Sequence, residues 1–444
     1  PPPPPPPLFK AEDGIRDLVL SLVGSEMYIR DRFKDRHRRT KRDFTRKRCL
    51  PFAIVVSFLL NMVKRALQDE LDEFFKLLNQ QDVAVRIVTK SAFSQARKKL
   101  KYKAFVELNQ AQVDYFYEHF EYKTWHGFRL LAVDGSTSQL PRTSEVAAHF
   151  GAWHPTQGDP CPLARVSQMF DVLNHVTLEA LISPKAMGER VLAARHFDCL
   201  QSSDLVLLDR GYPAFWLFAL ILEQGAHFCA RMPLGGWLAV EQFVASGLSE
   251  QIVLLWPSSE AVQECRSRGL SLAPIKARLI RIELDSGEVE VLATCLVDDT
   301  AYPATVFKEL YHKRWPVEEN YKVMKSRIEI ENFTGKSVHT VYQDFHAKVF
   351  TMNLTAILAH PAQRAVEQEC WGRKYAYQIN MTNALSKMKD TVVLLIQHTA
   401  ILPILERLWQ VLTQTIEPIR PGRSYPRVKR VRRRRFPMAY KPIR

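Results

Sequence analysis

The sequence predicts an α/β core that is interrupted by a β-strand insertion and flanked by helical regions at both ends. Three observations predict this class. Short apolar runs alternate with helical patterns between residues 128 and 233, strand-like segments dominate residues 235–300, and apolar residues recur at helical spacing on both sides. Alternating strands and helices are typical of a mixed α/β sheet.

Residues 1–32 are expected to lie outside the fold. Seven prolines lead into KAEDGIRD and SLVGSEMYIRDR, and this segment resembles the translation of sequencing-library adapter oligonucleotides. A proline run adopts polyproline II, which has no internal hydrogen bonds, so we expect these residues to be disordered. Authentic sequence would then begin near Phe33.

Residues 33–120 are predicted to form a basic helical module. Residues 34–48 are dense in Lys and Arg, and apolar positions at helical spacing follow over residues 51–78. A second helix is predicted to begin at Ser91 as its N-cap. This helix carries a basic cluster of Arg97, Lys98, Lys99, Lys101 and Lys103. A basic second helix suits a DNA-recognition module, and a plain helical hairpin is an equal alternative.

The core is predicted from the short apolar segments that follow. Strands are expected at residues 128–134, 166–174, 176–183, 203–209 and 226–233, and helices at residues 189–201 and 214–225. Residues 235–300 contain three further strand-like segments, separated by turn signals, and are interpreted as a β insertion.

Helical patterning returns at Ala304 and continues to about Leu412. We therefore assign residues 121–340 to the core and residues 341–415 to a helical C-terminal region. Residues 416–444 are interrupted by prolines, and no acidic residue follows Glu417. These last residues are predicted to be a disordered basic tail.

Composition limits the class of partner and the compartment. The 444 residues carry a net charge of +15, which predicts a polyanionic partner such as DNA or RNA. Charge alone also fits a merely soluble basic protein. The seven cysteines are dispersed without zinc-site spacing, which fits a reducing cytoplasm. No apolar run reaches the roughly 18 residues that a membrane span requires.

Two acidic residues share one local pattern. Asp134 in LLAVDG and Asp209 in LVLLDRG each end an apolar strand and have a glycine immediately or one residue later. Ligands meet an α/β sheet at its strand ends, and a carboxylate there can coordinate a hard divalent ion. Because Asp-Gly is also a common turn, two interpretations of these aspartates are equally open: they bind a metal ion, or they only form turns.

A third acid lies in a more specific pattern. Four residues fall at offsets 0, 3, 7 and 14 and are expected to share one helical face within roughly 60°. They are Tyr311, Arg314, Glu318 and Lys325. A carboxylate between two cations and a tyrosine is suited to phosphoryl transfer, whereas a solvated polar stripe is the alternative. Pro316 either begins this helix or kinks it.

These residues resemble the insertion-sequence-family-four DDE transposases, the bacterial group that includes the transposon-five enzyme. The family pattern Y-x2-R-x3-E-x6-K is matched without a gap by YHKRWPVEENYKVMK. The first family Asp precedes a glycine, as Asp134 does, and the second lies in D-R-G-[YF], as in Asp209-Arg210-Gly211-Tyr212. The resemblance covers residues 33–444.

The resemblance implies a DNA transposase with an RNase H-like core, in which the β insertion at about residues 235–300 separates the second Asp from the Glu. Asp134, Asp209 and Glu318 would hold two Mg²⁺ ions, or Mn²⁺ in their place. The enzyme would cut an insertion sequence at its terminal inverted repeats and join the 3′-OH ends to target DNA.

The resemblance also implies contacts and partners. Phosphate contacts are expected from Tyr311, Arg314, Lys325 and Arg210, and Trp237 is the expected stacking partner of a flipped base. Double-stranded DNA is the expected partner, with a homodimer in the synaptic complex, in the bacterial cytoplasm at the nucleoid. Two alternatives remain: a metal-dependent nuclease of the same fold without strand transfer, and a non-catalytic DNA-binding relic.

Overall fold

The computed structural model describes residues 32–154, 156, 159–284, 287–397 and 401–420. The described chain forms two compact units. Unit 2 comprises Tyr122–Ser138 and Leu163–Lys322, and unit 1 comprises the described residues before, between and after these segments. Residues 33–120 and 341–415, which the sequence presents as two regions, therefore both lie in unit 1. The expected adapter-derived segment, apart from Arg32, and residues 421–444 lie outside the described residues.

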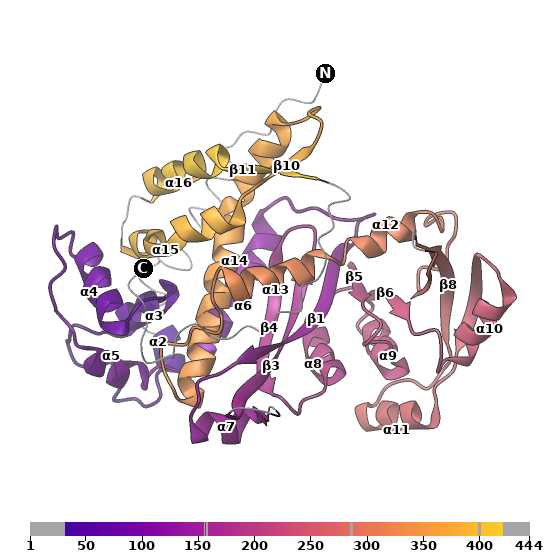
Figure 1. Cartoon of the computed structure of the whole chain (residues 1–444), viewed down its shortest axis with the longest axis horizontal. Helices are drawn as coiled ribbons and strands as arrows, with labels where there is room; N and C mark the ends of the chain where they lie inside the picture. The colour runs from indigo at the N-terminus through magenta and orange to yellow at the C-terminus, as the bar shows by residue number, and fades with distance from the viewer. Residues whose placement is uncertain (1–31, 155, 157–158, 285–286, 398–400, 421–444) are drawn as a thin grey trace. The chain divides into compact units, whose positions relative to one another are not determined.

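Unit 2 is built on a mixed β-sheet (Figure 1). Its strands follow the order β4-β3-β1-β5-β6-β9-β8-β7, in which β1, β5 and β6 are parallel and β3–β4 and β6–β9–β8–β7 pair in antiparallel fashion. The strands are β1 (Arg129–Gln139), β3 (Cys161–Asp171), β4 (Val176–Pro184), β5 (Asp204–Leu208), β6 (His227–Met232), β7 (Glu250–Leu255), β8 (Ile275–Glu283) and β9 (Val289–Thr294). The predicted mixed α/β sheet is confirmed.

The helices of unit 2 follow the sheet strands along the chain. They are α8 (Glu189–His196), α9 (Phe215–Glu223), α10 (Leu238–Ser246), α11 (Ser259–Arg268), α12 (Val306–His312) and α13 (Pro316–Ser326), whose last turn enters unit 1. The predicted strand-rich insertion at residues 235–300 carries β7, β8 and β9, and it also contains two helices that the sequence analysis did not predict, α10 and α11. Left-handed glycines at Gly247 and Gly269 end these two helices, which is the usual role of glycine after a helix.

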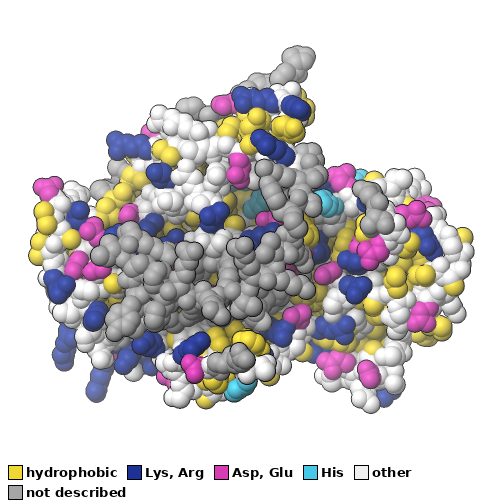
Figure 2. Space-filling model, viewed as in Figure 1, with side chains coloured by type: hydrophobic (Ala, Val, Ile, Leu, Met, Phe, Trp, Pro, Cys, Tyr) yellow, Lys and Arg dark blue, Asp and Glu magenta, His cyan; other side chains and the backbone are white. Residues whose placement is uncertain are grey.

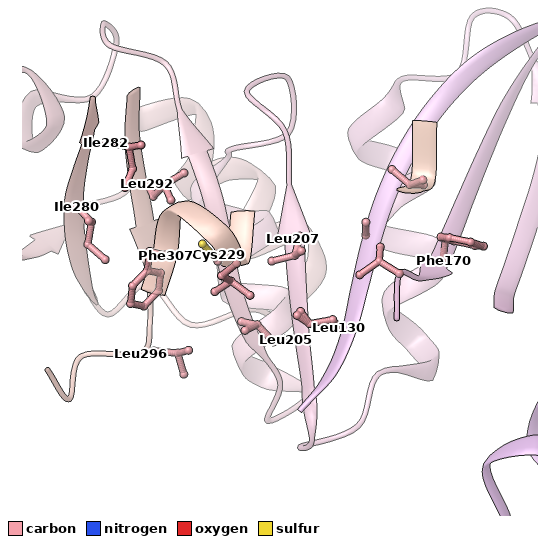
Figure 3. Close-up of a cluster of buried hydrophobic side chains, with 14 residues drawn as sticks. Leu130, Phe170, Leu205, Leu207, Cys229, Ile280, Ile282, Leu292, Leu296 and Phe307 are labelled. Atoms are coloured by element: carbon pink, nitrogen blue, oxygen red, sulfur yellow. The ribbon is translucent and has the colours of Figure 1, made fainter. Parts of the chain in front are cut away.

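The insertion is continuous with the core of unit 2. β9 pairs with β6, and residues from β8 and β9 pack in one buried cluster with residues of β1, β5 and β6 (Figure 3). Phe307 and Leu310 of α12 and Val317 of α13 complete this cluster, each with 0% exposure. Burial of these three side chains draws α12 and the start of α13 onto the sheet, because apolar surface is removed from water there.

Unit 1 is mainly helical. Its long helix α14 (Val338–Glu369) packs mainly against α3 (Phe52–Leu60), α6 (Lys103–His119), α15 (Met381–Gln397) and α16 (Leu402–Gln414) of this unit (Figure 1). The remaining elements are α2 (Phe33–His37), α4 (Leu67–Leu78), α5 (Lys90–Arg97), α7 (Ser144–Phe150), β2 (Ala152–Trp153), β10 (Ala376–Ile379) and β11 (Ile416–Ile419). No helix of the described residues is both long and apolar enough to span a bilayer.

Three details of unit 1 differ from the sequence predictions. Residues 51–78 form two helices, because the chain turns between α3 and α4. Thr89, not Ser91, caps the next helix, and its side chain accepts a hydrogen bond from the Ala92 backbone N–H at 3.2 Å. Residues Ile416–Ile419, assigned to the disordered tail, pair with β10 as a strand.

Arg97 is a further correction. The sequence places it in a basic cluster suited to DNA recognition, but its side chain is only 2% exposed. Its guanidinium donates to Asp344 at 2.7 Å, to Gln343 at 2.9 Å and to Thr334 at 2.6 Å. Arg97 therefore belongs to the interior of unit 1, because a buried guanidinium is tolerated only when its charge and its N–H groups are satisfied.

Candidate active site

Asp134 and Asp209 are brought together by the register of two parallel strands. The β1–β5 ladder ends with the pair Val133 and Leu208, so each acid is the next residue on its strand. Neighbouring strands lie about 4.8 Å apart. Both side chains are half-buried. Asp134 does not end its strand as predicted, since β1 continues to Gln139, but the parallel pairing with β5 stops in front of it.

The third acid reaches this site through a break between two helices. α12 ends at His312 and α13 begins at Pro316, so the prediction of one continuous helical face is wrong. Pro316 begins α13, the first of its two predicted roles. Proline has no N–H group to donate and its fixed φ suits the first turn of a helix. Tyr311 therefore lies on α12 and Arg314 in the turn, whereas Glu318 lies on α13.

Tyr311 and Arg314, two of the four motif residues, nevertheless contact the acids. The Tyr311 hydroxyl donates to Asp209 Oδ1 at 3.3 Å, and Arg314 Nη2 donates to Glu318 Oε1 at 2.7 Å. The Arg314 guanidinium lies 5.8 Å from the centre of the Tyr311 ring. A chain of contacts therefore connects Asp209 with Glu318.

The electrostatics of the site are those of crowded negative charge. Burial raises the pKa of Asp134 to about 6, and the carboxylates of Glu318 and Asp209 act in the same direction. A hydrogen bond from the Gly135 N–H at 2.8 Å and the charge of Arg314 act in the opposite direction. Burial opposes the charged form of Arg314, but Tyr311 and the nearby carboxylates outweigh it and raise the Arg314 pKa. A cation at this place would relieve the repulsion among the acids.

The donor chemistry fits a hard divalent cation. Three carboxylates supply only oxygen ligands, which Mg²⁺ and Mn²⁺ prefer. In the part of the chain that the structure describes, no three His, Cys, Asp or Glu side chains are already arranged around one ion position. Glu318 is instead turned to Arg314. The carboxylates of Asp134, Asp209 and Glu318 can hold such an ion. In this structure the Glu318 carboxylate is paired with Arg314.

Two residues on α13 that the sequence did not reveal fasten this helix to the sheet. The Tyr321 hydroxyl donates to the backbone oxygen of Asp134 at 2.8 Å, and the Asn320 amide donates to Gln168 Oε1 at 2.9 Å. The apolar spacing of Val317, Tyr321 and Met324 marks the buried face of α13 in the sequence. It does not show that the Tyr321 hydroxyl bonds to the backbone of a catalytic candidate.

A pocket of about 550 Å³ adjoins Tyr311 and Arg314 within unit 2. It combines cationic, aromatic and apolar walls, lined by Arg231, Ile282, Leu284, Glu290, Leu292, Thr305, Lys308, Glu309, Tyr311, His312, Arg314 and Trp315. Trp315 is 41% exposed. Arg231 is paired with Glu290 at 2.7 Å. The pocket therefore offers an exposed aromatic ring and basic groups next to the acids.

The other predicted site residues, Arg210, Trp237 and Lys325, do not share in the contacts that connect Asp209 with Glu318. Arg210 is exposed and directly follows Asp209. Trp237 is half-buried at the start of α10 and packs against Phe218, with ring centres 6.0 Å apart, and it does not line the pocket. Lys325 lies on α13 seven residues beyond Glu318, in the part of the helix that belongs to unit 1.

Comparisons with known proteins agree with the motif residues. Residues 125–354, more than half of the chain, match the Transposase DDE domain family. A transposase of insertion sequence element IS4 from Escherichia coli K12 is 24% identical over 343 residues, which cover 75% of this chain and 70% of the relative. A putative transposase, InsZ, of the same bacterium is 23% identical over 150 residues, which cover 33% of this chain and 50% of the relative.

Among solved structures, a piggyBac transposase synaptic complex with hairpin DNA matches with a TM-score of 0.45 and 9% identity, over 94% of this chain and 87% of that one. The family match and the IS4 relative confirm the resemblance that the Tyr311, Arg314, Glu318 and Lys325 pattern predicted. The chain belongs to the DDE transposase family and is an insertion-sequence-family-four transposase.

Proposed function

We propose that this transposase cuts an insertion sequence at its terminal inverted repeats and joins the 3′-OH ends to target DNA, with Asp134, Asp209 and Glu318 as its catalytic acids. The single observation that carries the proposal is the register of β1 and β5. It sets Asp134 and Asp209 on adjacent parallel strands, each one residue beyond the last β1–β5 pair, while Arg314 and Tyr311 connect Glu318 to the same place.

We further propose that the core is RNase H-like. The order β4-β3-β1-β5-β6, an antiparallel meander extended by two parallel strands, supports this assignment. The insertion that carries β7, β8 and β9 lies between Asp209 and Glu318 in the sequence.

Asp134, Asp209 and Glu318 are the residues that would hold two Mg²⁺ ions, with Mn²⁺ as a substitute. Bound there, divalent ions supply activation of a water or 3′-OH nucleophile and stabilisation of the leaving oxygen. Burial of Asp134 and its repulsion by the other two acids support this assignment, because a site of unbalanced negative charge favours a cation.

The cationic residues near the acids are assigned to DNA phosphates. Arg314 is held in one orientation by Glu318 and by the Tyr311 ring, and a fixed guanidinium binds phosphate oxygens with good geometry. Tyr311 can donate a hydrogen bond to a phosphate in place of Asp209. Arg210, exposed beside Asp209, and Lys325, further along α13, are proposed to contact the flanking backbone.

The pocket beside Arg314 is proposed to receive a nucleotide next to the cut. Its volume lies in the range of about 300–1,000 Å³ that is usual for small-ligand sites. The exposed ring of Trp315 is suited to stacking on a base, and Lys308 and Arg231 can approach its phosphate. Trp315 is therefore a better stacking candidate than Trp237, whose ring packs against Phe218.

A basic surface of unit 1 is proposed to bind the inverted repeats. The Arg39 N–H donates to the Lys99 carbonyl at 2.9 Å and the Lys101 N–H to the His37 carbonyl at 2.8 Å. These bonds bring residues 37–39 beside residues 99–101, between two basic stretches of the chain. In Figure 2, Lys and Arg side chains gather at the lower left, where Figure 1 shows α5. Such a surface attracts a phosphate backbone by releasing counterions.

Two further features remain proposals. A homodimer in the synaptic complex would use the helical residues 341–415, and the protein would act at the nucleoid in the bacterial cytoplasm.

Glu318→Gln tests the catalytic assignment, with Glu319→Gln as the matched control. Glu319 is exposed and is paired with Lys322 and Trp315, so its replacement removes the same charge one residue away. With Mg²⁺ and a duplex that carries the terminal inverted repeats, Glu318→Gln is expected to lower cleavage by more than about 100-fold. Equal cleavage by Glu318→Gln and wild type would overturn the assignment.

The same assay separates transposase from nuclease. The wild-type protein is expected to join its cut ends to a target plasmid. Nicking without joining would favour the metal-dependent nuclease, and binding without nicking would favour the non-catalytic relic.

A further inference from the structure

Glu318 lies on a helix whose rotation is held by buried side chains around it. The Tyr321 hydroxyl, on a residue that is 7% exposed, donates to the Asp134 backbone oxygen at 2.8 Å. The Asn320 amide donates to Gln168 Oε1 at 2.9 Å and to Thr177 Oγ1 at 3.3 Å. α13 is therefore hydrogen-bonded to β3, to β4 and to the backbone of Asp134 on β1.

A further hydrogen bond holds the residue before Glu318. The Gln168 side-chain amide donates to the Val317 backbone oxygen at 3.3 Å. Gln168 and Val317 are both 0% exposed. Glu318 thus lies between a fastened residue before it and two fastened residues after it.

The ion pair between Arg314 and Glu318 does not by itself fasten α13 to the sheet, which it reaches through Tyr311. Arg314 is four residues earlier in the same segment. A helix that slips by one residue turns by about 100° and advances about 1.5 Å. Such a slip would direct Glu318 away from the other acids, and metal ligands must be held within about 0.5 Å of the productive geometry.

We propose that Tyr321 and Asn320, acting with Gln168, are positioning residues that hold Glu318 in reach of Asp134 and Asp209 before a divalent ion binds. The proposal rests on the proposed function of the three acids as metal ligands. Tyr321 is the principal member, because its hydroxyl joins the helix of one acid to the backbone of another. The affinity of the protein for divalent ions therefore depends on a hydroxyl that does not itself touch the ion.

Tyr321→Phe tests this role by removing only the hydroxyl, and Tyr212→Phe is the matched control. Tyr212 is also buried, at 3% exposure, and burial raises its pKa in the same acidic surroundings. Among the described residues its hydroxyl has no hydrogen-bond partner. The measurement is the binding of Mn²⁺ to the full chain without DNA, followed by the electron paramagnetic resonance signal of free Mn²⁺.

Tyr321→Phe is expected to weaken Mn²⁺ binding about 10-fold, the lower end of the range observed when a residue that orients a ligand is changed. Tyr212→Phe is expected to bind Mn²⁺ as wild type does. Asn320→Ala provides a second variant at a half-buried position and is expected to weaken binding in the same direction. Thermal unfolding without metal shows how far each change affects folding itself.

The outcomes are distinct. Wild-type Mn²⁺ affinity within twofold in both Tyr321→Phe and Asn320→Ala would overturn the positioning role, even if both variants melt earlier. An equally weakened affinity in Tyr212→Phe would overturn it as well. The metal-site assignment fails if the wild-type protein does not bind Mn²⁺, or if Asp134→Asn binds it equally well. The positioning role then fails with it.

Discussion

Arg314 donates to Glu318 at 2.7 Å across the turn between α12 and α13, and its guanidinium is largely buried. The pair joins the cation and the acid of the motif in one contact. A positive charge thereby lies next to three carboxylates and opposes the rise in the Asp134 pKa.

Removal of the Arg314 charge is expected to impair catalysis more than DNA affinity. Arg314→Met would leave the acids with less compensation, so kcat for cleavage of the inverted-repeat duplex should fall about 100-fold. Arg314→Lys keeps the charge but not the planar geometry and should retain more activity. Steady-state cleavage checks both variants, and a rise in KM alone would contradict this role.

Arg97 is expected to contribute to stability and not to DNA binding. Arg97→Met would leave Asp344 buried without its partner and should lower the free energy of unfolding by about 3–5 kcal/mol. The neighbouring Lys98 is exposed, so Lys98→Met should change the free energy of unfolding by less than about 0.5 kcal/mol. Urea unfolding measures both variants. Full stability in Arg97→Met, with weakened DNA binding, would show that Arg97 contacts DNA.

The basic surface is expected to control the salt dependence of DNA binding. Changing Arg39, Lys98 and Lys103 together to Gln should reduce the slope of log K against log salt by about 0.9 for each phosphate that the variant no longer neutralises. A control with the same charge change at the exposed Lys276, Lys374 and Lys387 should keep the wild-type slope. Fluorescence anisotropy across a salt series checks this, and equal slopes in the two triple variants would refute the assignment.

We expect Trp315 to contribute to activity and Trp237 to contribute to stability. Trp315→Ala should reduce cleavage with little change in melting temperature, because the ring is exposed at the pocket. Trp237→Ala should lower the melting temperature, because it removes packing against Phe218, and leave the activity of the folded protein intact. Cleavage rates and melting curves of both variants test the distinction. The reverse pattern would restore Trp237 as the stacking residue.

His346 is expected to make unit 1 sensitive to acid. Burial lowers the His346 pKa to about 3, against 6.5 ordinarily, and the ring stacks on Tyr102. The unfolded chain therefore binds a proton between pH 6.5 and 3 that the folded chain does not. The stabilising contribution is complete above pH 6.5 and declines as pH falls, by up to about 2 kcal/mol at pH 5.

Replacement of this histidine should reduce that sensitivity. Urea unfolding of wild type and His346→Phe at about pH 7 and about pH 5 measures the difference between the two pH values. The loss of stability between about pH 7 and about pH 5 should be smaller in His346→Phe than in the wild type. An identical loss in both proteins would exclude His346 as its source.

The sequence by itself determined the features that depend on neighbours along the chain. Apolar runs predicted the core strands, and helical spacing predicted most helices, because both periods are properties of the local backbone. The motif residues Tyr311, Arg314, Glu318 and Lys325 identified the family without any structure. The excess of Lys and Arg predicted a polyanionic partner, since net charge is a sum that needs no coordinates.

Only the tertiary structure decided which of these residues act together. Arg97 and Asp344 are 247 residues apart in the chain, and nothing in the local pattern of Arg97 separates it from the exposed lysines beside it. The register of β1 and β5 places Asp134 next to Asp209, and the bond from Tyr321 to the Asp134 backbone depends on how α13 packs. Such contacts arise from long-range pairing and burial, which local periodicity does not encode.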